Sequence, residues 1–217
     1  MPENTTTENT PVSGFTRRGF LKGAGITAAV AVVEGRLVEP AAAQTEADVK
    51  VLNTPVSGEV KITLNINDTD RPVTVEPRTT LLSACRDRLE PAITGPKLVC
   101  NAGTCGACTM IMNGKTVYGC SILAVDAVGK KVTTVEGIGT PEKLSPVQAA
   151  FVEKDGMMCG FCTSGFVTAI TAYLAKKPNP TLDELKTNIK GNFCRCGTYP
   201  HIFEAAMAAS KALSGAR

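Results

Sequence analysis

The sequence is poor in the side chains that mark nucleic-acid binding or membrane insertion. It has no tryptophan, three tyrosines, seven phenylalanines and a formal net charge of only +3, without a basic run. Nucleic-acid-binding proteins present clustered basic residues, so this composition excludes that class of function. The apolar stretch 23–33 has about eleven residues, whereas a membrane-spanning helix needs about twenty. Glu34 and Arg36 end this stretch, and we therefore expect no integral membrane span.

Groups that could carry out catalysis are also scarce. His201 is the only histidine, and Gly137-Ile138-Gly139 lacks the third glycine and the following helix of a dinucleotide-binding fingerprint. We therefore predict no catalytic residue in this chain. Any substrate chemistry would belong to a partner.

Cysteine, in contrast, is abundant, and eight of the nine cysteines form two sets of four. The first set is Cys100, Cys105, Cys108 and Cys120. The second set is Cys159, Cys162, Cys194 and Cys196. The first spacing, C-x4-C-x2-C followed by a more distant cysteine, is that of a plant-type [2Fe-2S] site. A Rieske centre needs two histidines, and the single histidine excludes it.

Disulfides and zinc are alternative uses of these thiols. Gly103 and Gly106 in the segment CNAGTCGAC would let the backbone wrap an inorganic cluster and direct N–H groups at its sulfurs, which a disulfide does not require. Structural zinc sites usually use C-x2-C knuckles, which C-x4-C-x2-C is not. The second spacing, C-x2-C…C-x-C, is less specific, because a zinc ribbon resembles its first half.

Cys85 is the ninth cysteine, and its context differs. Leu81, Cys85 and Leu89 recur every four residues, which places them on one face of a predicted helix. Cysteine behaves as a small apolar residue when it is buried. We therefore expect Cys85 to lie in the core without a redox role.

The N-terminal residues have the features of an export signal. Arg17 and Arg18 form a paired arginine in the segment TRRGFLK, the apolar stretch 23–33 follows, and Ala41-Ala42-Ala43 is a small-residue cleavage site. We interpret residues 1–43 as a twin-arginine signal peptide and residues 44–57 as a linker. This route exports folded proteins, so clusters could be inserted in the cytoplasm before the protein reaches the periplasm.

The pattern from residue 58 onward predicts an α+β fold. Residues 60–66 alternate apolar and polar side chains, Asn67 to Asp70 form a turn, and Asn113-Gly114 is the turn of a second hairpin. A further short strand is predicted at 131–135. A sheet that clasps one helix and carries a metal-binding loop at its edge is the β-grasp ferredoxin arrangement, which we assign to residues 58–137, with a linker at 138–144.

Residues 145–217 have helical periodicity and predict four helices in two similar units. Ser145 and Thr181 each begin a capping box, and we expect Gly156 and Gly191 to end the helices that follow. A cysteine pair and a second helix come next in each unit, the last helix beginning at Pro200. The scheme predicts a pseudo-twofold four-helix bundle that binds a second [2Fe-2S] cluster, with each cysteine pair before a helix N-terminus, where anionic groups are stabilised.

The two cysteine motifs, in this order, carry a family resemblance. The plant-type loop, then CGFCTSG and GNFCRCGTY before a C-terminal helix, resemble the small iron–sulfur subunit of the molybdenum hydroxylases, the xanthine dehydrogenase and aldehyde oxidase family. The resemblance covers residues 60–210. With the twin-arginine segment and CRCGTYPHI, the sequence is most similar to the iron–sulfur subunits of periplasmic aldehyde oxidoreductases.

This resemblance implies a function, cofactors and partners. It implies two [2Fe-2S] clusters that pass single electrons from a large subunit with molybdopterin, of the cytosine dinucleotide type, to an FAD-binding subunit or another acceptor. Cys196 would bind iron and approach the pterin, and Met158 occupies the position of a glutamine that contacts the pterin in the family. Other interpretations are the iron–sulfur subunit of an N-heterocycle hydroxylase, and a stand-alone ferredoxin-like carrier or redox sensor, although a carrier usually needs one cluster and a strongly charged docking face.

Overall fold

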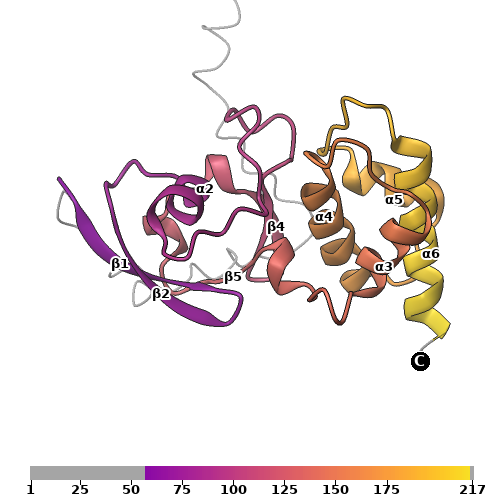
Figure 1. The fold of residues 1–217 in the computed structure, drawn as a ribbon, viewed down its shortest axis with the longest axis horizontal. Helices are drawn as coiled ribbons and strands as arrows, with labels where there is room; N and C mark the ends of the chain where they lie inside the picture. The colour runs from indigo at the N-terminus through magenta and orange to yellow at the C-terminus, as the bar shows by residue number, and fades with distance from the viewer. Residues whose placement is uncertain (1–56, 216–217) are drawn as a thin grey trace, which may run out of the picture. The chain divides into compact units, whose positions relative to one another are not determined.

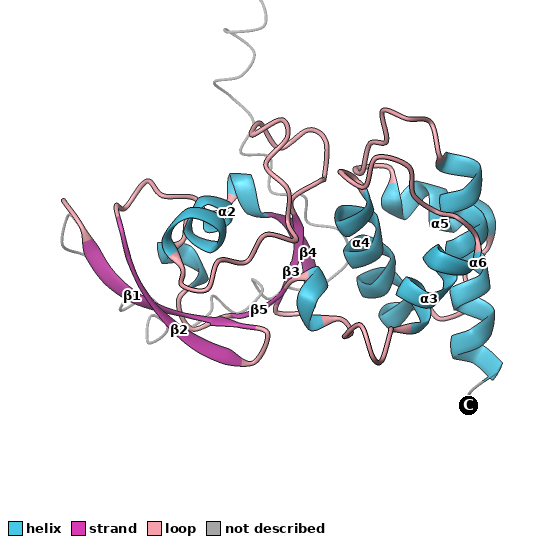
Figure 2. Cartoon of the chain, in the orientation of Figure 1, coloured by secondary structure: helices cyan, strands magenta, loops and turns pink. Residues whose placement is uncertain are grey.

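Strands occupy the first half of the described chain and the longer helices occupy the second (Figure 1, Figure 2). The computed structural model describes residues 57–215. The predicted signal peptide, 1–43, lies outside the described residues, as does all of the predicted linker 44–57 except its last residue. The predicted α+β class is confirmed.

The first hairpin follows directly from the period-two pattern. Strands β1 (Val60–Ile66) and β2 (Thr69–Val75) pair in antiparallel register, with Val60 opposite Val75. Their inward-facing side chains, Leu64, Ile66, Val73 and Val75, are buried. Asn67 and Asp68 have φ angles of 54° and 58°, as a two-residue type I′ turn requires. The turn is therefore tighter than the predicted one, and Thr69 and Asp70 belong to the strand.

The second hairpin and a fifth strand complete the sheet. Strands β3 (Thr109–Met112) and β4 (Lys115–Tyr118) are joined by Asn113-Gly114, whose φ angles of 47° and 74° confirm the predicted type I′ turn. Strand β5 (Lys131–Thr133) is parallel to β1 and antiparallel to β3, which gives the order β2-β1-β5-β3-β4. The predicted strand 131–135 is too long, because Val135–Gly137 forms a 3₁₀ turn.

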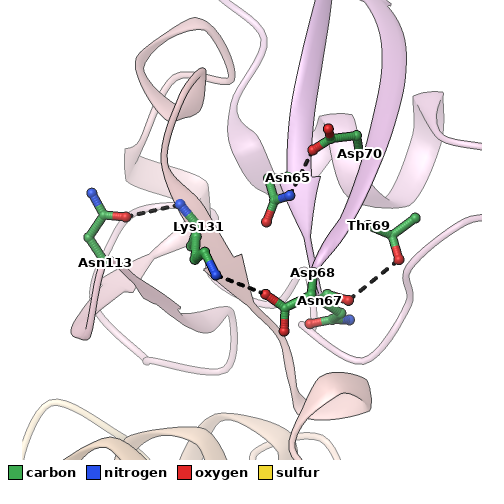
Figure 3. Close-up of polar contacts among 7 residues, drawn as sticks. All are labelled: Asn65, Asn67, Asp68, Thr69, Asp70, Asn113 and Lys131. Carbon is green, nitrogen blue, oxygen red and sulfur yellow. Dashed lines mark hydrogen bonds and ion pairs between the residues drawn. The ribbon is translucent and has the colours of Figure 1, made fainter.

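Side chains from both hairpins hold the start of β5 in place (Figure 3). The Asn113 side-chain oxygen accepts a hydrogen bond from the Lys131 backbone N–H at 2.9 Å. The Lys131 ammonium lies 3.3 Å from the Asp68 carboxylate. Both side chains of this ion pair are exposed, so the pair adds little stability and the backbone ladder carries the register.

The predicted helix around Cys85 is short and irregular. Helix α2 (Leu81–Ser83) passes directly into a π-helical turn, Ala84–Arg88. Cys85 is fully buried beneath the sheet core, and burial, with the charge of Glu136, raises its pKa to about 12. The predicted burial of this thiol in the core is confirmed.

The four predicted helices are present: α3 (Pro146–Glu153), α4 (Thr163–Lys176), α5 (Leu182–Ile189) and α6 (Tyr199–Gly215). Ser145 and Thr181 form complete capping boxes with Gln148 and Glu184, as predicted.

The end of α3 differs from the prediction. The helix ends at Glu153, not at Gly156, and Asp155 takes the left-handed conformation with a φ of 50°. The Gly156 N–H then bonds to Phe151 O at 2.8 Å, which is the Schellman geometry with aspartate in the position that glycine usually fills.

Two hydrophobic cores lie within the same compact unit of the chain, Leu52–Arg217. One core lies between the sheet and α2, and it includes Leu64, Met110 and Val132. The other lies among the helices, and it includes Phe166, Ile170 and Ile202. Helix α4 packs against β3 and β4, so the two cores are joined through the faces of α4 and the second hairpin.

Candidate iron–sulfur sites

The first cysteine set lies on one continuous segment around the second hairpin. Cys100 and Cys105 belong to the loop before β3, Cys108 immediately precedes β3, and Cys120 lies in the 3₁₀ turn after β4. Cys108 and Cys120 are 3% and 8% exposed, whereas Cys100 and Cys105 are partly exposed. The hairpin thus returns Cys120 to the cysteine loop.

The environments of these thiols pull their pKa values in opposite directions. Hydrogen bonding to the Thr104 side chain, to the backbone N–H groups of Ala102 and Thr104 and to Cys105 lowers the pKa of Cys100 to about 5. Ala102 N lies 3.4 Å from Cys100 Sγ. Burial and the neighbouring thiol of Cys120 raise the pKa of Cys108 to about 12. The surroundings of the partly exposed Cys100 therefore favour its thiolate form. The buried Cys108 would need a nearby cation such as iron to stabilise its thiolate.

The second cysteine set comes from two loops that are distant in the sequence. Cys159 and Cys162 connect α3 to α4, with Cys162 as the residue that caps α4, and Cys194 and Cys196 connect α5 to α6. Gly160, between the first two cysteines, and Gly197, after the last, have φ angles of 82° and 80°. Both loops therefore turn through a left-handed residue beside their thiols, as glycine allows at low cost.

The second set also has an inner and an outer part. Cys194 is 4% exposed and Cys162 partly exposed, while Cys159 and Cys196 are exposed. Burial and the Cys194 thiol raise the pKa of Cys162 to about 12. Burial also acts to raise the pKa of Cys194, but hydrogen bonds from the backbone and hydroxyl of Thr198 and from Cys162 lower it overall.

Within each set, thiols lie near enough to shift one another's pKa values. In the first set, Cys120 and Cys105 act on Cys108. In the second set, Cys194 and Cys159 act on Cys162, and Cys159 also acts on Cys196. No disulfide joins any of the nine cysteines.

The four cysteines of each set match the number of thiolate ligands that a [2Fe-2S] cluster takes. Among residues 57–215, no group of three His, Cys, Asp or Glu side chains is arranged to hold a single metal ion. The buried hydroxyl oxygens of Thr163 and Ser164, directly after Cys162, have no hydrogen-bond partner in the described structure, as expected beside a group that supplies acceptors.

The loop that carries Cys105 contacts the loop that carries Cys194 and the start of α4. We call this contact the junction; its residues are Gly106, Gly165, Asn192 and Phe193. The Phe193 N–H donates to Cys105 O at 2.9 Å. The Asn192 side chain is buried and donates to Gly106 O at 2.8 Å and to Thr109 Oγ1 at 3.1 Å. A Cβ atom on Gly165 would overlap Gly106 O, so this close approach requires glycine in α4.

Tyr118 supports the junction from the sheet side. Its hydroxyl donates to Gly191 O at 2.9 Å. Burial and the four thiols of the first set together raise its pKa. The phenol therefore stays protonated beside the cysteines and keeps its hydrogen bond to the helical part.

The predicted positions Cys196 and Met158 lie on the exposed side of the second set. Met158 is 69% exposed, Phe161 58% and Phe193 50%. These large apolar side chains belong to the two loops that carry the second set, in which Cys159 and Cys196 are exposed. Large exposed apolar side chains that gather on one surface are typical of interaction sites.

Sequence reasoning missed Asn192, Tyr118 and Thr198 as parts of the site. Tyr118 and Asn192 contact residues that are distant in the sequence, and Thr198 contacts a cysteine across a folded loop. Hydrophobic periodicity and capping patterns do not predict such contacts. Asn192 lies two residues before Cys194 and Thr198 two residues after Cys196 in GNFCRCGT, and that proximity is the signal that the sequence offers.

Comparisons with known proteins agree with this geometry. Residues 134–207 match the family described as the [2Fe-2S] binding domain. The aldehyde oxidoreductase iron–sulfur-binding subunit PaoA of Escherichia coli O157:H7 is 37% identical over 206 residues, which cover 88% of this chain and 86% of PaoA. The nicotine 6-hydroxylase small subunit of Paenarthrobacter nicotinovorans is 40% identical over 151 residues, covering 70% and 90% of the two chains.

Solved structures give the same result. A chain of quinoline 2-oxidoreductase from Pseudomonas putida 86 superimposes with a TM-score of 0.68 at 37% identity, covering 73% of this chain and 98% of that one. The fold, the cysteine-bearing loops and these relatives thus define an iron–sulfur electron-transfer protein. The chain belongs to the family of iron–sulfur subunits of aldehyde oxidoreductases and related molybdenum hydroxylases.

Proposed function

We propose that this chain is the electron-transfer subunit of a molybdopterin-dependent aldehyde oxidoreductase and that it carries two [2Fe-2S] clusters. The observation that carries the proposal is the hydrogen bond from Phe193 N–H to Cys105 O, because it joins the two thiol sets. Cys105 belongs to the first set, and Phe193 precedes Cys194 of the second. The sets are thus linked by the covalent bonds of these residues and one hydrogen bond.

The exposure of the cysteines suggests a path for electrons from the surface of the second set inward to the first set. Cys159 and Cys196 are exposed, Cys194 is buried, and Cys105 lies across the junction from Cys194. When bound, a [2Fe-2S] cluster accepts and releases one electron at a time. The chain's own contribution is to hold the thiolates in place, exclude water from the inner pairs and keep the junction closed through Asn192.

We further propose that the two cores correspond to two domains. The sheet and α2 would form a β-grasp ferredoxin domain, 58–137, and the helices would form a pseudo-twofold [2Fe-2S]-binding bundle, 145–217, with a linker at 138–144. Two separate hydrophobic cores and the two capping boxes at equivalent places support this division.

The exposed patch around the second set supports a permanent partner. Met158, Phe161 and Phe193 would be covered by a large subunit that holds molybdopterin, with Cys196 binding iron and lying nearest the pterin. Electrons would leave the first set toward an FAD-binding subunit or another acceptor. A stand-alone carrier would expose this apolar surface repeatedly to water, which disfavours that alternative.

The iron–sulfur subunit of an N-heterocycle hydroxylase is the second candidate. It is favoured by the 40% identity to a nicotine 6-hydroxylase small subunit and by the likeness to quinoline 2-oxidoreductase. The longer alignment with PaoA favours the aldehyde assignment. Assaying the assembled complex with aldehydes and with N-heterocycles separates the two.

The division of labour can be tested in that complex. We expect the isolated chain to oxidise no aldehyde, and the complex to reduce an artificial acceptor when aldehyde is supplied. Met158→Gln should retain activity, whereas Cys196→Ala should lose it with one iron site. Aldehyde turnover by the isolated chain, or full activity of the Cys196→Ala complex, would contradict the proposal.

We also propose export to the periplasm by the twin-arginine route. The alignment with PaoA covers 88% of this chain, more than residues 57–215 make up, so the likeness extends into the N-terminal region. Changing Arg17 and Arg18 together to lysine keeps the charge but removes the guanidinium pair. The variant should accumulate in the cytoplasm with its iron bound; normal periplasmic levels would refute the assignment.

A further inference from the structure

Thr198 places a hydroxyl group beside a buried thiol of the second set. Thr198 Oγ1 lies 3.7 Å from Cys194 Sγ, within hydrogen-bonding range for sulfur. Both residues are buried, with exposures of 6% for Thr198 and 4% for Cys194. Water therefore has little access to this contact.

The surrounding bonds fix the positions of both residues. The Thr198 carbonyl accepts from Ile202 N at 3.1 Å in the first turn of α6. The Cys194 N–H donates to the Tyr199 hydroxyl at 2.9 Å. The Thr198 side chain is thus anchored at the start of a 17-residue helix, with its hydroxyl in contact with Cys194 Sγ.

The direction of the bond follows from the state of the sulfur. A thiolate that binds iron has no proton, so it can only accept, and the hydroxyl must donate. The first set has a comparable hydroxyl, Ser121 Oγ, at 3.6 Å from Cys120 Sγ, but Ser121 is exposed. Water can replace the Ser121 bond, whereas nothing replaces the Thr198 bond.

We propose that Thr198 is a positioning residue that sets the reduction potential of the second cluster by donating its hydroxyl proton to Cys194 Sγ. This inference rests on the proposed function, because it requires iron at the second set. Reduction adds negative charge to the cluster and its sulfurs, so a donor to sulfur stabilises the reduced state more than the oxidised one. Loss of the donor should shift the potential to more negative values.

Two matched pairs isolate the hydroxyl group. Thr198→Val keeps the shape of the wild-type side chain and removes the hydroxyl, and Thr198→Ser and Thr198→Ala differ from each other by the hydroxyl alone. We would titrate the complete chain, purified with its clusters, and follow each cluster by electron paramagnetic resonance. Thr198→Val and Thr198→Ala should shift only the second cluster to a lower potential, and Thr198→Ser should stay near wild type. If Thr198→Val does not assemble, the Ser and Ala pair makes the same comparison.

A control and a spectroscopic readout separate this role from a structural one. Thr168→Val removes another fully buried hydroxyl of the helical part, one that donates to Ser164 O at 2.8 Å and not to sulfur, so it should leave both potentials unchanged. Electron–nuclear double resonance in deuterated solvent should show an exchangeable proton coupled to the second cluster in wild type and lost in Thr198→Val.

The outcomes distinguish this inference from the proposed function. Equal second-cluster potentials in wild type and Thr198→Val, or the same shift in Thr168→Val, would overturn the role of Thr198 while both clusters remain. Absence of a second cluster from the wild-type chain would overturn the proposed function itself.

Discussion

The two thiol sets, for which we propose the same chemistry, are assembled in different ways. The first lies within residues 100–120, on one loop and one hairpin. The second combines a loop at 159–162 with a loop at 194–196, which meet only because α4, α5 and α6 pack around a common core. Local chain geometry therefore determines the first set, and tertiary packing determines the second.

Removing one ligand from each set should give the largest effects. Cys105→Ser and Cys194→Ser should each abolish one of two reduced-cluster signals in electron paramagnetic resonance and leave the other. Cys85→Ser is the matched control, since Cys85 belongs to neither set of four cysteines and its replacement should leave both signals intact. Loss of both signals in either single variant would show that the two sets are not separate centres.

Adding a methyl group at Gly165, where α4 approaches the first cysteine loop closely, should disturb the packing around the second set. Gly165→Ala places a Cβ atom against Gly106 O, and we expect it to lower the free energy of unfolding by about 1–3 kcal/mol, as overpacking does. Gly215→Ala is a helical control with open space around it, and it should be neutral or stabilising by at most about 1 kcal/mol. Equal effects in urea unfolding would contradict the close approach of α4 to the cysteine loop.

The stability of α5 should depend on acidic pH, and that of α3 should not, although this effect is smaller than those above. Hydrogen bonding to Lys177 and to the Thr181 backbone N–H lowers the pKa of Glu184 to about 2 from 4.5. A depressed pKa means that the stabilisation is complete above pH 4.5 and is lost as the pH falls toward 2. The protection factors of the α5 amides, which are corrected for the intrinsic exchange rate at each pH, should therefore fall over this range in wild type and change less in Glu184→Gln.

The equivalent position in the other unit provides the reciprocal test. Gln148 closes the α3 capping box without a charge, so α3 should show no matching acid dependence. Gln148→Glu should introduce one. Identical acid profiles for α3 and α5 in wild type would contradict this difference between the units.

The sequence predicted the elements whose cause is local. The Asn113-Gly114 turn and the capping boxes at Ser145 and Thr181 are each specified by a few adjacent residues, and all three are confirmed. The predicted end of α3 at Gly156 is wrong by a few residues, because Asp155 adopts the left-handed conformation that glycine usually takes.

The contacts between the two halves could not be predicted in this way. The bonds from Asn192 to Gly106 and from Phe193 to Cys105 join residues more than eighty positions apart. Neither hydrophobic periodicity nor capping chemistry encodes such a pairing. The cysteine spacing identified the candidate ligands, but only the fold shows which backbone and side-chain contacts connect the two sets.

The most direct test of the central claim is the metal content of the complete chain, purified without oxygen and examined after reduction. Two sets of four thiolates predict about four irons and about four acid-labile sulfides per chain, with two distinguishable paramagnetic signals. A chain that folds with zinc and contains no iron, or one that holds a single cluster, would contradict the electron relay across the junction between Cys105 and Cys194.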